Sequence, residues 1–447
     1  MKKTVFLAAA AIALASCSSD ELVNSTAGDM NGESPIAFSV EKKNITRGTK
    51  FEELQRYNFG VWAYKVKGTE SQLVMSNYLV GYSDGVGTGY DNSAVEKSTW
   101  NASTDDVYDH KSPWFYEKLG NLEYSYSGDK NFFKTSESVN QYQYLRYWDL
   151  AYTNTNFYAY APYKATGVGY ADGKITVENG AQTAGYDDNS KTEFLYAGYK
   201  ALNSDKKDVL LQFYHLGAKV NLQFYEDIPG YKVEIIDVKE DKSGIQATPA
   251  TKSGTTYTKA DYYTTCGATI NYNDNMEPTA TVSHVDDAAN KSNKNLIFNL
   301  PSNTEIPQAG ASTPQDYAKS TTTYYAVAQP TTSEVGFTFH VSYKIIAEDN
   351  GEEITVHDAR VYVPAKSVSG ETTTYIAAWQ PNTAYTYTFK ITKESTGTTK
   401  PNDDDIDPTS PTIPTTKALY PIVFDGATVE EYAPTTIPET VISEKSN

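Results

Sequence analysis

Residues 336–363 read GFTFHVSYKIIAEDNGEEITVHDARVYV, and this stretch indicates the fold class of the protein. Its two halves, residues 336–345 and 353–363, are rich in β-branched and aromatic side chains, which favour β-strands. Asn350 and Gly351 lie between the halves, and Asn-Gly is the strongest short-range signal for a type I′ hairpin turn. The stretch therefore predicts a β-hairpin.

The rest of the 447-residue chain has the same character. It contains 37 Tyr and only 4 Met, and almost no window shows the period of an amphipathic helix. Residues 209–213 and 220–224 are expected to be the arms of a second hairpin, joined near Gly217. Other strands are expected at residues 35–40, 59–66, 144–150, 156–161, 193–199, 232–238, 295–300, 324–328 and 385–391. The sequence predicts an all-β protein.

Charge and chemistry-bearing residues exclude several classes of function. Lys and Arg number 38 against 56 Asp and Glu, a formal charge of −18, so the basic surface that nucleic acid requires is missing. Cys266 has no nearby His, and the Gly-x-Ser-x-Gly string at residues 81–85 lacks the strand and helix that flank it in hydrolases. His340 and His357 are expected to form a cross-strand pair on the hairpin. We expect a protein that is not an enzyme and holds no cofactor and no metal ion.

The chain divides at the turn signal Pro229-Gly230. Two β-sandwich domains in series are expected, at residues 48–228 and 229–393. Residues 394–417 are rich in Pro, Thr and Asp, as in a linker. Residues 418–447 then regain strand character. A lone hairpin has too small a core to be stable, so this C-terminal extension must pair with its own domain or with another chain.

The first residues match an export signal. Residues 1–16 carry two Lys, then an apolar run and then small residues, which is the order of a signal peptide. They end in Leu-Ala-Ser before Cys17, which resembles the lipobox of bacterial lipoproteins, where the Cys is acylated and becomes the mature N-terminus. Ordinary secretion with a free Cys17 is the alternative. Residues 18–34 are polar and suit a flexible tether.

Several short motifs follow one another along residues 17–391. After the lipobox they are SSDE at 18–21, IAF at 36–38, ITRG at 45–48, FGVWAY at 59–64, FYAYAPY at 157–163, FYHL at 213–216 and WQPNTAY at 379–385. In this order they resemble the fimbrillin family of Bacteroidetes, the subunits of type V pili.

The resemblance implies a fold, a processing route and a set of partners. The fold is all-β, with two tandem transthyretin-like β-sandwich domains and a C-terminal extension. The chain is exported as an outer-membrane lipoprotein precursor through Cys17. A protease then cuts between Arg47 and Gly48, so that residues 17–47 form a propeptide whose strand is lost. The mature chain is a structural subunit of a cell-surface fimbrium that supports adhesion. Its partners are other pilin subunits, the processing protease, the membrane through the lipid, and a host or bacterial surface ligand. Taken from the residues alone, Arg47 can also be a plain surface charge.

The physics of the first strand supports strand exchange. Removing Ile36, Phe38 and Val40 from a sandwich exposes an apolar groove and unpaired strand edges, which are templates for an added strand. A replacement should present the same alternation of apolar residues on a flexible arm.

The C-terminal extension contains a candidate replacement. Its sequence PIVF at 421–424 echoes PIAF at 35–38 and follows the linker. We therefore predict that Ile422 and Phe424 of one subunit occupy the pockets vacated by the first strand of the next. Residues 437–442 are the competing donor.

The role within a pilus stays open at this point. A cleavable Arg together with a donor tail favours a stalk subunit, whereas a tip or anchor subunit lacks one of the two. The alternative from a different class is a surface glycan-binding lipoprotein of a nutrient-uptake system, which is also acidic, lipidated and β-rich.

Overall fold

The computed structural model describes residues 34–40, 58–82, 114–116, 125–127, 130–132, 143–186, 192–236, 245–254, 256–301, 304–310, 312–392 and 422–431. Within them the protein consists of β-strands and irregular connections, apart from one turn of 3-10 helix, η4 (Ala288–Asn290). The prediction of an all-β fold is confirmed. The signal peptide, Cys17, Arg47, Gly48, the 394–417 linker and residues 437–442 lie outside the described residues.

The N-terminal part is built on an eight-stranded sheet in the order β12-β1-β4-β3-β2-β7-β11-β13. Its strands are β1 (Phe38–Val40), β2 (Phe59–Lys67), β3 (Glu70–Tyr82), β4 (Trp114–Phe115), β7 (Asn154–Ala161), β11 (Leu195–Leu202), β12 (Val209–Leu211) and β13 (Tyr214–His215). The long strand β3 pairs with β2 and, at its end, with β4. The sheet thereby folds over itself, and strands β12, β1 and β4 enclose an apolar core with β2, β7 and β11.

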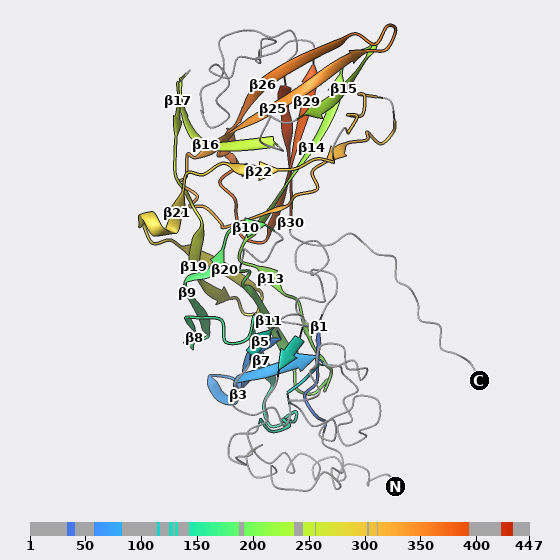
Figure 1. Ribbon diagram of the computed structural model, residues 1–447. Helices are drawn as coiled ribbons and strands as arrows, with labels where there is room; N and C mark the ends of the chain where they lie inside the picture. Colours follow the sequence, from blue (N-terminus) through green and yellow to red (C-terminus); the bar gives the residue numbers. More distant parts are fainter. Residues whose placement is uncertain are drawn as a thin grey trace, which may run out of the picture.

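The other face of β2, β7 and β11 carries a second layer. A four-stranded sheet covers it, in the order β20-β19-β9-β8. Its strands are β8 (Val168–Ala171), β9 (Lys174–Thr183), β19 (Thr265–Tyr272) and β20 (Pro278–Ser283). Large aromatic side chains such as Trp62, Tyr160 and Phe194 fill the space between the layers. Figure 1 shows β9, β19 and β20 between the blue strands at one end and the orange strands at the other.

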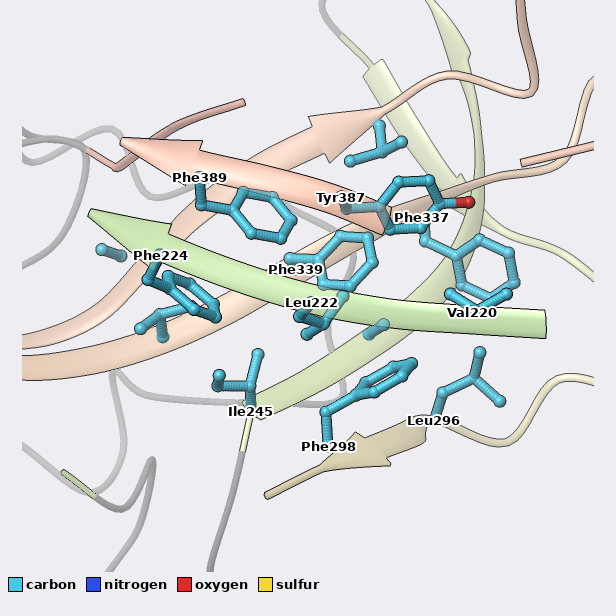
Figure 2. Packing of buried hydrophobic residues seen from close by; sticks show 14 of the residues in the cluster. Val220, Leu222, Phe224, Ile245, Leu296, Phe298, Phe337, Phe339, Tyr387 and Phe389 are labelled. Carbon is cyan, nitrogen blue, oxygen red and sulfur yellow. The ribbon is translucent and has the colours of Figure 1, made fainter. Parts of the chain in front are cut away.

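The C-terminal part is a sandwich of two six-stranded sheets. One has the order β10-β24-β14-β29-β30, with β23 beside β14, and the other has the order β15-β25-β16-β17, with β22 beside β16 and β26 beside β25. Their bounds are β10 (Gly185–Tyr186), β14 (Ala218–Asp227), β15 (Tyr231–Ile236), β16 (Ile245–Ser253), β17 (Thr256–Lys259), β22 (Leu296–Phe298), β23 (Ala318–Lys319), β24 (Tyr324–Ala326), β25 (Gly336–Ala347), β26 (Glu353–Val363), β29 (Thr383–Thr392) and β30 (Ile422–Glu431). Alternate side chains of β14, β25 and β29 meet in the core, where Phe339 packs against Phe389 and Tyr387 (Figure 2).

The remaining strands form three short two-stranded pairs. These are β5 (Ser125–Ser127) with β6 (Lys130–Phe132), β18 (Tyr262–Tyr263) with β21 (Lys291–Ser292), and β27 (Lys366–Ser369) with β28 (Thr372–Tyr375).

Of the two predicted hairpins, one is confirmed and one is wrong. β25 and β26 pair antiparallel across Asn350 and Gly351, but the loop is longer than a two-residue turn, since Ala347 N donates to Glu352 O at 2.9 Å. Residues 209–213 and 220–224 do not pair with each other. β12 instead lies parallel to β1, and β14 lies between β24 and β29, because each strand has an apolar face that belongs to a different core.

Strands near the predicted domain boundary take part in both halves of the chain. β14 precedes Pro229, yet its apolar side chains belong to the C-terminal core. β19 follows the boundary, yet it pairs with β9 of the N-terminal half. The division into residues 48–228 and 229–393 therefore stays a prediction.

Candidate functional site

The first strand completes the N-terminal core. Ile36 is 1% exposed and Phe38 is fully buried. The Phe38 ring makes edge contacts with Phe59, Tyr116 and Phe157 at centroid distances of 5.9, 5.6 and 5.8 Å. Burial of a side chain of this size is worth about 1.5–3 kcal/mol. This short segment thus supplies a large part of the packing on the inner faces of β2 and β7.

Backbone hydrogen bonds hold the same segment on both sides. Ile36 N donates to Arg146 O at 2.7 Å, and Tyr116 Oη donates to Ile36 O at 2.8 Å. Val209 N donates to the carbonyl oxygen of Ala37 at 2.8 Å. Three other segments, around residues 114–116, 143–148 and 209–211, thereby depend on residues 34–40 for partners.

The pairing of β1 is short. Its partners on β12 are Val209, Leu210 and Leu211, and on β4 it meets only Trp114. Val40 is placed opposite Leu211 by this register. Loss of β1 would leave the edges of β12 and β4 unpaired over an apolar floor, and unpaired edges readily accept another strand.

The arginines differ in their accessibility. The chain has Arg47, Arg56, Arg146 and Arg360, and the first two lie outside the described residues. Arg146 donates through Nε to Tyr78 Oη at 2.9 Å, and its backbone is bonded to the first strand. Arg360 is 4% exposed and lies within β26. Arg146 is therefore held by hydrogen bonds and Arg360 by its strand, and neither of these two arginines lies in an open loop.

The candidate donor strand is placed on its own domain. β30, which includes Ile422 and Phe424, pairs antiparallel with β29 from Ile391↔Ile422 to Thr383↔Glu431. Tyr225 Oη donates to Asp425 Oδ2 at 2.7 Å beside this pair. β30 ends the sheet order, so it is an edge strand among the described residues (Figure 1). Of the two pairings that the sequence left open, the monomer adopts the one with its own domain.

A buried polar cluster lies on β16, β25 and β26. His340 Nδ1 is 3.0 Å from Asp358 Oδ1, and His340 Nε2 is 3.1 Å from Thr248 Oγ1. Arg360 Nε donates to Asp358 Oδ2 at 2.7 Å. The expected pair of His340 with His357 is therefore wrong, because a bulge in β26 turns Asp358 toward the imidazole.

The cluster has the order hydroxyl, imidazole, carboxylate that is known from hydrolases, but its members are sealed. Thr248, His340 and Asp358 are each 0% exposed, so no substrate can reach the hydroxyl. Cys266, a free thiol within the described residues, is also buried, and burial raises the pKa of its thiol to about 12. The polar cluster and Cys266 are therefore both part of the packed interior.

The described part of the chain lacks two further kinds of site. No group of three or more His, Cys, Asp or Glu side chains gathers there in a way that could hold a metal ion. No helix in these ranges has the length and apolar character needed to cross a membrane.

The fold is that of an all-β protein whose N-terminal core is completed by the short first strand. A family model described as Fimbrillin-like matches residues 82–404, and the chain belongs to this family. Membership supports a role as a fimbrial subunit at the cell surface that contacts other pilin subunits.

Several solved structures are similar to this chain. A putative cell adhesion protein from Bacteroides uniformis is 12% identical, with 90% of this chain and 99% of that chain covered and a TM-score of 0.38. The fimbrial anchor protein Mfa2 from Porphyromonas gingivalis is 7% identical, with coverage of 90% and 98% and a TM-score of 0.27. A putative cell adhesion protein from Parabacteroides distasonis is 10% identical, with coverage of 84% and 93% and a TM-score of 0.29. No curated protein matches the sequence.

Proposed function

We propose that the protein is a structural pilin that polymerises by donor-strand exchange. It is exported as a lipoprotein through Cys17 and reaches the outer membrane as a precursor. Cleavage after Arg47 then releases residues 17–47, which include β1. A strand from a neighbouring subunit fills the vacated groove. The observation that carries this proposal is the seating of Ile36 and Phe38 in the core by a segment with few backbone pairs.

Two further observations support this route. Among the described strands, β1 pairs with β12 over three residues and with β4 at one, so few strand pairings are lost when it leaves, and the edges of β12 and β4 are then open to a new strand. Contacts between the groove of one subunit and the arm of the next are head-to-tail. Contacts of this kind do not close into a ring unless the rotation allows it, and they generate filaments.

The processing step can be tested with Arg47→Ala. In wild-type protein taken from the surface of a fimbriated Bacteroidetes host, we expect a chain that begins at Gly48 and forms a ladder of multimers on an unheated gel. The Arg47→Ala chain should keep its N-terminus and run as a monomer, because β1 still fills the groove. Arg56→Ala is the matched control and should be processed normally. Intact mass and N-terminal sequencing give the readout.

A different result would overturn this route. A wild-type chain that begins at acylated Cys17 and runs as a monomer points to an anchor subunit or a glycan-binding lipoprotein. Normal processing of Arg47→Ala combined with a block in Arg56→Ala would move the cleavage site to Arg56.

The donor is proposed to lie in residues 418–447. For Ile422 and Phe424 to serve, β30 must first leave β29, which breaks an antiparallel pairing along its whole length. Because β30 is an edge strand, this release does not split a sheet. The alternative donor, residues 437–442, lies beyond β30.

Paired substitutions distinguish the two donors. We expect that Ile422→Asp with Phe424→Asp abolishes the multimer ladder while the monomer still unfolds cooperatively on heating, since an apolar groove rejects carboxylates. Ile437→Asp with Ile442→Asp is the matched comparison. A ladder that persists in the first variant and disappears in the second assigns the donor to the terminal segment instead.

A further inference from the structure

A cleft lies between the β8–β9 hairpin and the strands β2, β3 and β7. Its volume is about 360 Å³, which falls in the range of small-ligand pockets of about 300–1,000 Å³. Side chains of both kinds line it, aromatic and polar, and they include Tyr64, Ser71, Asn156, Tyr158, Tyr170 and Asp172. We propose that this cleft binds a neutral sugar residue of a surface glycan.

A column of stacked rings leads from the core to the cleft. Phe194, Tyr160, Trp62, Tyr170 and Tyr64 follow one another with centroid distances of 6.1, 5.3, 5.4 and 5.3 Å and interplanar angles of 16°, 25°, 20° and 21°. The first three rings are buried, and the last two are half-buried. The column therefore ends in rings that border the cleft.

The end of the column suits the apolar face of a pyranose. The face of an aromatic ring is electron-rich, and the axial C–H groups of a sugar carry a small positive charge, so the two surfaces attract each other. Tyr64 stacks on Tyr170 on one side, and a sugar on its other side would extend the column by one member. Tyr158 flanks the Tyr64–Tyr170 pair, at 83° to Tyr64 and 63° to Tyr170, with centroid distances of 6.2 and 4.9 Å.

Polar groups around the rings match sugar hydroxyls. Asn156 lies on β7 beside Tyr158, and Asn154 Nδ2 donates to its Oδ1 at 2.8 Å, which orients the amide. Ser71 and Asp172 are exposed at the rim. Tyr64 and Tyr170 add phenol hydroxyls, which are protonated at neutral pH as in any tyrosine, and burial raises the pKa of both further.

The charge of the lining selects a neutral ligand. No Lys or Arg lines the cleft, and its one acidic group is Asp172. The chain as a whole has a formal charge of −18. Sialylated or phosphorylated glycans would therefore be repelled rather than bound.

The cleft is preorganised by its hairpin. Asp172 and Gly173 both have positive φ, 50° and 73°, and join β8 to β9 in a two-residue turn of type I′. This turn holds Tyr170 against the column and brings Gly173 beside the Tyr158 hydroxyl. A site that is rigid before binding loses less entropy when the ligand arrives.

The test uses the full-length chain, so it does not depend on processing or polymerisation. The protein is applied to an array of neutral and sialylated oligosaccharides, and the strongest neutral hit is titrated by calorimetry. We expect neutral glycans to bind and Tyr64→Ala to weaken the binding by about tenfold. Tyr64→Phe keeps the ring and should retain most of the affinity. Tyr257→Ala, at a half-buried Tyr on β17 outside the cleft, is the matched control.

Three outcomes overturn the proposal. They are an array without a neutral hit, a preference for sialylated glycans, and unchanged affinity in Tyr64→Ala with a loss in Tyr257→Ala. Thermal unfolding of each variant tests whether a loss of binding is a loss of fold, and Asp172→Asn, which suits the positive φ of this exposed turn position, provides a second cleft variant. Failure here leaves the pilus proposal intact, because the Arg47 experiment reads a different property.

Discussion

Asp358→Ala is expected to lower the free energy of unfolding of the C-terminal part by about 3–5 kcal/mol, as is usual when one partner of a buried ion pair is removed. Asp358 is fully buried and accepts hydrogen bonds from the Arg360 guanidinium, while the His340 ring lies against its other oxygen. Without the carboxylate, the Arg360 charge stays in the interior, and position 358 no longer supplies a counter-charge. The contribution of this carboxylate to offsetting the desolvation of the guanidinium is then lost.

The backbone adds to this effect. Asp358 has φ 52°, a left-handed conformation that Asp and Asn tolerate better than Ala. Its N–H donates to Ser342 Oγ at 2.9 Å within the bulge of β26. Asp358→Asn keeps the shape and the conformation and should therefore be less destabilising than Asp358→Ala.

Denaturant unfolding measures the expected loss, and hydrogen–deuterium exchange in peptides from residues 336–363 locates it. Glu353→Ala is the matched control on the same strand. Glu353 pairs with Lys344 at 3.1 Å, but their side chains are 52% and 37% exposed, and such a surface pair contributes about 0.2–1 kcal/mol. Equal effects of Asp358→Ala and Glu353→Ala on the free energy of unfolding would show that the buried cluster contributes no more to stability than a surface ion pair.

Phe38→Ala is expected to lower the free energy of unfolding of the N-terminal part of the precursor by about 3–5 kcal/mol, the usual range for Phe-to-Ala in a core. The Phe38 ring contacts aromatic rings on β2 and β7 as well as Tyr116. Its loss leaves a cavity that these rigid rings cannot fill. Strand β1 has few backbone pairs, so the whole segment should loosen with it.

Hydrogen exchange in peptides from β7 and β12 reports this loosening. Ser39→Ala is the control, because the neighbouring side chain on a strand points to the opposite side and Ser39 is only half-buried. If Phe38→Ala were as stable as Ser39→Ala, the first strand would not be an integral part of the core. The proposal that its removal opens a groove would then lose its basis.

Much of the fold could be predicted from short stretches of sequence. The alternation in residues 336–345 and the Asn350-Gly351 signal both lie within one hairpin, so local propensity and turn chemistry suffice to place it. The Asp172-Gly173 turn carried an equally strong signal and was missed, although it holds the wall of the aromatic cleft. The order of motifs also indicated the family before any contact was known.

Other features depend on residues far apart in the chain. Val209 pairs with Phe38, and His340 meets Thr248, although nothing in the spacing of these residues links them. The expected pairing of residues 209–213 with 220–224 is wrong for this reason. Both runs contain strands, but the apolar face of each packs into a different core.

The sequence by itself indicated the all-β class, many of the strands and the family to which the chain belongs, because these follow from consecutive side chains, their period and the order of short motifs. Only the tertiary structure decided which strands pair, that β30 lies on β29, and that Tyr64 ends a column of rings at a cleft. The physical reason is that a strand has two edges and two faces that are chemically similar from one strand to the next. The choice among partners is made by the packing of whole cores, to which residues from distant parts of the chain contribute together.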